Sequence, residues 1–178
     1  MNNLSEPEDP GLFSQRNRPD LIGEHRLGDA GQLILLVLFL VIWVLDSFVL
    51  SYSTRMINII PWYIRYPLAI AVMVFAGYLA RSGLRTVFGE VKPEPQVYST
   101  GVFSIVRHPI YLGSILTYLG FIFFTLSLAS FLFWILIIIF YFYISRYEER
   151  LLLKHFGDQY REYQSRVPML FPFKIRRG

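Results

Sequence analysis

Long apolar runs alternate with polar stretches along the chain, and this pattern predicts a helical membrane protein. The first apolar run extends from about Leu33 to Leu50, and the second extends from about Trp62 to Ala80. Each run is close to the roughly 20 residues that a helix needs to cross a bilayer. We therefore predict one membrane helix in each run, with an interfacial aromatic belt at the start of the second.

The third apolar run carries no charged residue from Ile110 to Ile144. These roughly 35 residues would form a helix of about 50 Å, whereas the hydrocarbon core of a bilayer is about 30 Å thick. Two structures fit this length: a hairpin that turns near residues 125–130, and one long helix that leaves the membrane. We favour the hairpin, because no polar residue marks where a single helix would exit. The expected fold is thus an all-α polytopic membrane protein with about four transmembrane helices.

The apolar runs are flanked by two polar regions. Residues 1–30 predict a polar N-terminal arm, with a short interfacial helix over residues 20–29, and residues 31–178 form the predicted transmembrane domain. After Ile144 the pattern becomes that of an amphipathic helix, which we expect to lie in the cytosol. Gly157 is expected to break or restart this helix.

The positive charges indicate an orientation in the membrane. Lysine and arginine are concentrated in segment 81–109 and in the tail after Ile144, while the intervening turns carry few or none. The positive-inside rule then places both termini and segment 81–109 in the cytosol. The modest net charge of +4 lies beside the apolar runs, which favours membrane orientation over nucleic-acid binding. The absence of cysteine excludes disulfides and thiolate metal sites, and no ligand-spaced motif predicts another metal site.

A first polar cluster stands at the start of the third apolar run, where Arg107, His108, Pro109 and Tyr111 fall within five residues. Proline suits the first turn of a helix, and a helix start leaves backbone N–H groups that attract anions. One interpretation is a pocket for a small, polar, partly anionic cofactor. The other is a helix N-terminus with interfacial anchors.

A second cluster, with Glu148 and Glu149 beside Arg146, follows the same apolar run. The adjacent carboxylates are suited to binding a cation such as an ammonium or a sulfonium, or they face water and pair with neighbouring arginines. A hairpin would bring both clusters to one membrane face. Asp46 is an intramembrane carboxylate, for which function is the default hypothesis. Our topology places it toward the opposite face, which favours a packing role.

Three segments together resemble a known family. Residues 96–113, with the sequence QVYSTGVFSIVRHPIYLG, look like the signature of the isoprenylcysteine carboxyl methyltransferases and their phospholipid-methyltransferase relatives. Residues 148–163 resemble the second motif of that family, and residues 166–172 resemble its closing motif. The three motifs occur in the family's order and cover roughly residues 96–173.

The resemblance implies a membrane methyltransferase that uses S-adenosyl-L-methionine. In the family, the segment matching His108 to Tyr111 helps to enclose the cofactor, and the glutamate matching Glu148 binds it. Arg107 and Arg146 are expected to act in positioning. The full set of expected cofactor-binding residues is Gln96, Gly101, Phe103, His108, Pro109, Ile110, Tyr111, Glu148 and Glu149.

The chain departs from the carboxyl methyltransferases at two places. Gln96 follows Pro95 where they carry a histidine, and Ile144 stands where they carry an arginine for the substrate carboxylate. We therefore expect a lipophilic acceptor, either a small molecule, a lipidated substrate or a membrane lipid, that need not be a prenylcysteine. The alternatives are a phospholipid amine N-methyltransferase and a non-enzymatic membrane scaffold or transporter subunit.

Overall fold

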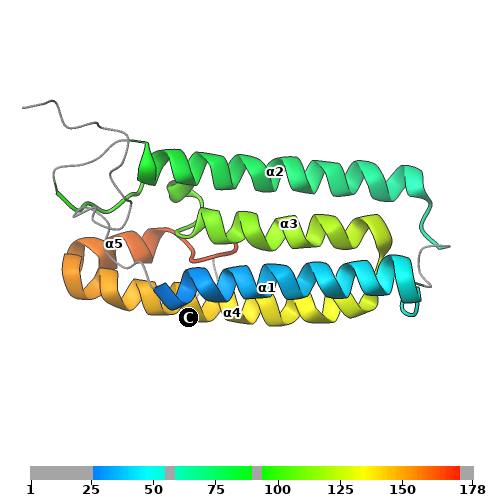
Figure 1. Ribbon diagram of the computed structural model, residues 1–178. Coiled ribbons are helices and arrows are strands. Elements are labelled where there is room, and N and C mark those ends of the chain that lie inside the picture. Colours follow the sequence, from blue (N-terminus) through cyan, green and yellow to red (C-terminus); the bar gives the residue numbers. More distant parts are fainter. Residues whose placement is uncertain (1–25, 55–58, 90–93, 173–178) are drawn as a thin grey trace, which may run out of the picture.

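A computed structural model describes residues 26–54, 59–89 and 94–172, and within them every regular element is a helix. This confirms the predicted all-α membrane fold. The order along the chain is α1 (Arg26–Val44), a π-helical turn (Leu45–Leu50), α2 (Trp62–Phe88), a 3₁₀ turn (Gly101–Ser104), α3 (Pro109–Thr125), α4 (Leu128–Phe156) and α5 (Asp158–Arg166). Figure 1 shows α1 to α4 lying side by side along one direction, with α5 folded back at one end of the bundle.

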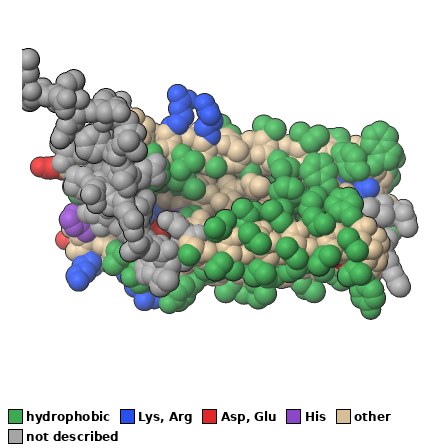
Figure 2. Space-filling view, in the orientation of Figure 1, with side chains coloured by type: hydrophobic (Ala, Val, Ile, Leu, Met, Phe, Trp, Pro, Cys, Tyr) green, Lys and Arg blue, Asp and Glu red, His purple; other side chains and the backbone are tan. Residues whose placement is uncertain are grey.

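Three segments of these helices are long and apolar enough to cross a membrane: Ala30–Leu50, Trp62–Phe88 and Leu128–Phe156. The fourth apolar helix, α3, has 17 residues and is shorter. Apolar side chains cover the flank of the bundle in Figure 2, while charged side chains gather toward the end at which α5 lies. This distribution is the one expected of a bundle whose sides face lipid.

The predicted hairpin is confirmed. Helix α3 ends at Thr125, and α4 begins at Leu128 after a turn of two residues. The Ser127 side chain caps α4 by accepting a hydrogen bond of 3.1 Å from the backbone N–H of Ser130. A serine at this position satisfies an N–H group that would otherwise be unpaired at the start of the helix.

The boundaries of the other helices differ from the prediction. The second apolar helix continues past Ala80 to Phe88, because Arg81 and Arg85 are good helix formers and a helix can leave the membrane without ending. Residues 1–25 lie outside the described part of the chain, and so does most of the predicted interfacial helix. Residues 26–29 belong to α1 and do not form a separate element.

Small residues hold α2 and α3 close together. Ala69, Ala76 and Gly83 recur at intervals of seven residues on the face of α2 that packs against α3, and all three are buried. A Cβ atom added to Gly113 of α3 would lie 2.9 Å from the Ala76 carbonyl oxygen, so only glycine permits this approach. Close packing of small residues is a usual means of joining helices in lipid. It fixes the start of α3, where the first polar cluster lies.

The opposite end of the bundle contains a second set of buried polar contacts. Asp46 is buried and accepts hydrogen bonds from the Ser53 backbone N–H, at 3.0 Å, and from the Ser127 hydroxyl. Arg65 is also buried, and its guanidinium donates to the Phe124 carbonyl at 2.6 Å. These contacts tie the end of α1 and the start of α2 to the hairpin turn, which supports the packing role expected for Asp46.

The orientation of the bundle remains a prediction that cysteine labelling can check. The sequence contains no cysteine, so each introduced thiol reports on one site. We expect cysteines at exposed Tyr52 and Leu128 to react with an impermeant maleimide from outside the cell, because they lie at the end opposite α5. Cysteines at exposed Arg85 and Arg161 should react only after the membrane is opened. Labelling of all four positions from one side would contradict the predicted topology.

Candidate functional site

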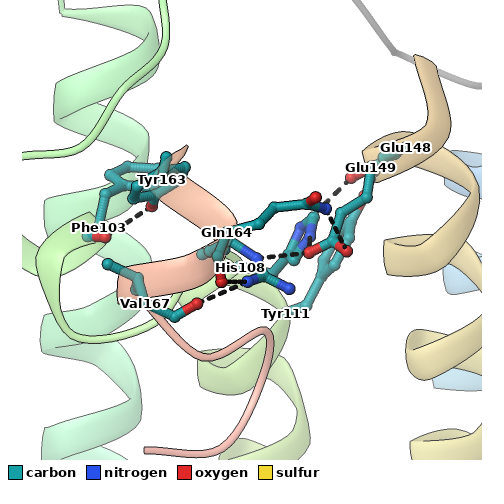
Figure 3. A network of polar contacts seen from close by, with 9 residues as sticks. Phe103, His108, Tyr111, Glu148, Glu149, Tyr163, Gln164 and Val167 are labelled. Carbon is teal, nitrogen blue, oxygen red and sulfur yellow. Dashed lines mark hydrogen bonds and ion pairs between the residues drawn. The ribbon is translucent and has the colours of Figure 1, made fainter. Parts of the chain in front are cut away.

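The two predicted polar clusters meet where α3 begins and α4 approaches its end (Figure 3). The imidazole of His108 lies between two carboxylates, with Nδ1 3.5 Å from Oε2 of Glu148 and Nε2 3.4 Å from Oε1 of Glu149. The contact with Glu149 has an ion-pair distance without the direction of a hydrogen bond. Tyr111 stacks parallel to the His108 ring, with the ring centroids 5.6 Å apart, and its hydroxyl donates to Glu148. The hairpin therefore joins residues that are some 40 positions apart in the sequence.

Arg107 forms an ion pair with the carboxylate of Glu149. Its Nε lies 2.6 Å from Oε1 of Glu149, and its NH1 donates to the backbone carbonyls of Gln164 and Val167 at 2.9 and 2.6 Å. The Gln164 side chain donates to the other oxygen of Glu149 at 3.0 Å. Glu149 is buried, whereas the side chain of Glu148 is 18% exposed. The two adjacent glutamates thus differ: Glu149 is enclosed, whereas Glu148, which contacts Tyr111 and His108, is partly exposed.

The segment after α5 closes over the start of α3. The backbone N–H groups of Arg107 and His108 donate to the carbonyls of Pro168 and Met169 at 2.9 and 3.1 Å. Leu170 is buried among side chains of the bundle. The closing segment thus occupies the amides of Arg107 and His108, which stand just before the first turn of α3. Anion binding by the amides of that turn stays a prediction.

Helix α5 also contributes residues that sequence reasoning missed. The Gln164 side chain reaches Glu149, and the Tyr163 hydroxyl donates to the Phe103 carbonyl at 2.6 Å. No spacing rule identifies either residue, since both act through long-range contacts. Their only sequence signal is their position, since Tyr163 ends the second motif and Gln164 follows it directly.

Three of the predicted cofactor-binding residues lie in or just before the 3₁₀ turn, and not among the carboxylates. Phe103 is buried and lies beside Tyr98, with ring centroids 6.1 Å apart. Gly101 has a φ of 60°, a conformation that favours glycine, and it opens the 3₁₀ turn that carries Phe103. Gln96 is exposed in the extended segment before that turn.

Three further positions lie away from the carboxylates. Pro109 is fully buried at the first position of α3, as predicted from its missing N–H, and Ile110 lies close to Gly83 of α2. Arg146 is exposed, and its guanidinium lies over the ring of Phe142 at 5.5 Å from the centroid. The structure does not bring Arg146 to the cluster. Arg146 is two residues before Glu148 in the continuous helix α4, and two residues turn a helix by about 200°, so the two side chains point in different directions.

The surroundings of His108 raise its pKa. Burial by itself disfavours the charged imidazolium, but the contacts with Glu148 and Glu149 of α4 outweigh burial and favour it. Tyr111, on the same segment, stacks on the ring. The folded protein thus binds the His108 proton more tightly than the unfolded chain.

This shift predicts a pH-dependent stability. The stabilisation is fully present below the unfolded pKa of about 6.5, and it is lost as the pH rises through the higher folded value. We expect the melting temperature in detergent to fall over that interval, and we expect a His108→Gln variant to lack this slope. Melting curves of both proteins at closely spaced pH values would check it. Parallel slopes in the two proteins would contradict the assignment to His108.

The fold and the site define a polytopic helical membrane protein with a carboxylate-rich polar site at one end of its bundle. Among the described residues, no group of three or more histidine, aspartate or glutamate side chains is placed to hold a metal ion. A family model described as phospholipid methyltransferase matches residues 64–159, which is over half of the chain and includes α3, α4 and nearly all of α2. The protein belongs to the phospholipid methyltransferase family, which confirms the predicted resemblance.

A named relative extends the comparison. Methanethiol S-methyltransferase 1 of Bradyrhizobium diazoefficiens is 28% identical over 134 residues, which cover 75% of this chain and 46% of that protein. The chain therefore spans about half the length of this relative. No solved structure matches the chain.

Proposed function

We propose that the protein transfers the methyl group of S-adenosyl-L-methionine to a lipophilic acceptor at the cytosolic membrane face. The observation that carries the proposal is the state of Glu148. This carboxylate is partly exposed, and Tyr111 and His108 hold it from one side. Its neighbour Glu149 is already paired with Arg107. The site thus presents the exposed part of a firmly held carboxylate to a ligand.

The chemistry of these residues fits the cofactor. S-adenosyl-L-methionine carries a positively charged sulfonium and an ammonium group, and either is attracted by a carboxylate in surroundings of low polarity. When bound, it would supply a methyl group on an electrophilic sulfur. The remaining work of the protein is to orient the two reactants, which contributes strongly to such transfers.

The residues of the chain have distinct tasks in this proposal. Glu148 would hold the positive charge of the cofactor, while Tyr111 and His108 fix the direction of that carboxylate. Arg107 keeps Glu149 buried and holds the closing segment over the site. An acceptor with an apolar body would approach from the lipid-facing flank, since it loses little by remaining in the hydrocarbon.

The apolar side chain of Ile144 argues against an acceptor that carries a carboxylate. Ile144 is buried in α4 where a carboxyl methyltransferase would carry an arginine, and Arg146 is exposed over Phe142. A buried carboxylate without a partner is costly, so we do not favour a prenylcysteine acceptor. The name of the family suggests an amine-bearing phospholipid, and the name of the relative suggests a thiol as the second candidate.

Equilibrium binding tests the proposal most directly. The purified protein in lipid nanodiscs should bind S-adenosylhomocysteine in a calorimetric titration. It should also transfer a radiolabelled methyl group from S-adenosyl-L-methionine to an acceptor in the organic phase. Failure to bind S-adenosylhomocysteine would reject the proposal in favour of a non-enzymatic membrane scaffold.

A further inference from the structure

Ser145 of α4 is completely buried, and its hydroxyl has no hydrogen-bond partner. Buried serine and threonine side chains in helices usually donate to the carbonyl four residues earlier. In α3, Ser114 and Thr117 do so at 3.2 and 2.9 Å. A buried hydroxyl that makes no such bond is destabilising unless a water or a ligand supplies the missing partner.

The hydroxyl lies beside the candidate cofactor site. Ser145 is four residues after Tyr141 and three and four residues before Glu148 and Glu149, so all four lie on one side of α4. Tyr111 extends along this side, because its ring lies 5.2 Å from the Tyr141 ring and its hydroxyl reaches Glu148. Ser145 therefore stands on the turn that Tyr111 passes, one turn from the carboxylates toward the membrane interior.

The charges around this turn restrict the ligand. Between Tyr141 and Glu149, this side of α4 carries no lysine or arginine, because Arg146 is exposed over Phe142. Arg107 is engaged by Glu149 and by two backbone carbonyls, and His108 is engaged by Glu148 and Glu149. An anionic group beside Ser145 would be next to two carboxylates without a cation of its own, which is unfavourable. A neutral group that accepts or donates one hydrogen bond fits.

We propose that Ser145 binds the methyl acceptor and that this acceptor is a thiol on an apolar body; the inference rests on the proposed function. A thiol is neutral at pH 7 and stays so in apolar surroundings, whereas an alkylamine is protonated in water and must lose a proton before it can attack. In the reaction, the acceptor sulfur forms a bond to the methyl carbon. The bond between that carbon and the sulfonium breaks, and its electron pair stays on the cofactor sulfur. The thiol proton passes to the carboxylate of Glu148.

Three acceptors with the same chain and different head groups test the proposal: octanethiol, octylamine and octanoate. With wild-type protein in nanodiscs, we expect methyl transfer to octanethiol and none to octanoate. Ser145→Ala should lower kcat/KM for octanethiol by about tenfold, chiefly through KM, since one hydrogen bond to the acceptor is lost. Ser145→Thr keeps the hydroxyl and should retain most of the activity.

Two further measurements separate an acceptor contact from a structural role. Ser145→Ala should bind S-adenosylhomocysteine as wild type does, and its melting temperature should stay the same or rise, because an unpaired buried hydroxyl is removed. A lower melting temperature together with unchanged transfer would assign Ser145 to packing and overturn the inference. Methylation of octanoate or octylamine in preference to octanethiol would also overturn the inference, and so would the absence of methyl transfer to all three compounds. If the inference about Ser145 fails in this way but wild-type protein binds S-adenosylhomocysteine, the proposed methyltransferase function still stands. If wild-type protein does not bind S-adenosylhomocysteine, the proposed function and the inference about Ser145 are both rejected.

Discussion

Replacing Arg107 with alanine should destabilise the protein by about 3–5 kcal/mol, the usual effect of removing one partner of a buried ion pair. The change leaves the buried carboxylate of Glu149 without its guanidinium. It also removes two hydrogen bonds that hold the carbonyls of Gln164 and Val167. Unfolding in mixed detergent with increasing dodecyl sulfate would measure the loss.

Two variants separate the charge from the geometry in that experiment. Arg107→Lys keeps a positive charge but lacks the planar fork that reaches Glu149 and the two carbonyls, so we expect intermediate stability. Arg107→Met combined with Glu149→Gln removes both charges and should recover part of the loss, because no unpaired charge remains. A single alanine variant as stable as wild type would show that the pair does not hold the closing segment.

Removing the charge of Glu148 should weaken S-adenosyl-L-methionine binding by about 100-fold, which corresponds to about 2.7 kcal/mol. Glu148 is the partly exposed carboxylate of the cluster, and Glu148→Gln keeps its shape while removing its charge. His108→Ala should act in the same direction, since the imidazole contacts both carboxylates. Calorimetric titration of each purified variant would measure the change.

A comparison of two ligands locates the interaction more closely. S-adenosyl-L-methionine has a sulfonium charge that S-adenosylhomocysteine lacks, while both carry an ammonium group. If Glu148 faces the sulfonium, Glu148→Gln weakens the first ligand more than the second; if it faces the ammonium, both weaken equally. Glu162→Gln, which removes an exposed carboxylate paired with Arg166, is the matched control and should bind both as wild type does. Wild-type affinity in Glu148→Gln would exclude this residue from the cofactor site.

The sequence by itself determined the class of fold and most of its helices. Apolar runs of membrane-spanning length, together with the excess length of the charge-free run from Ile110 to Ile144, were sufficient to predict the bundle and its hairpin. These features are local, because hydrophobic length and the need to satisfy backbone groups in lipid depend little on distant residues. The motif around His108 likewise carried the family resemblance, which the match to residues 64–159 confirms.

Only the tertiary structure decided how the polar residues divide their roles. Glu148 and Glu149 are adjacent and chemically identical, yet one is enclosed by Arg107 and Gln164 while the other is partly exposed. The closing segment occupies the amides of Arg107 and His108, which no local pattern predicts, and the unpaired hydroxyl of Ser145 has no signature in its spacing. Such differences depend on which side chains meet across α3, α4 and the segment after α5. Long-range contacts of this kind follow from packing and not from the pattern along the chain.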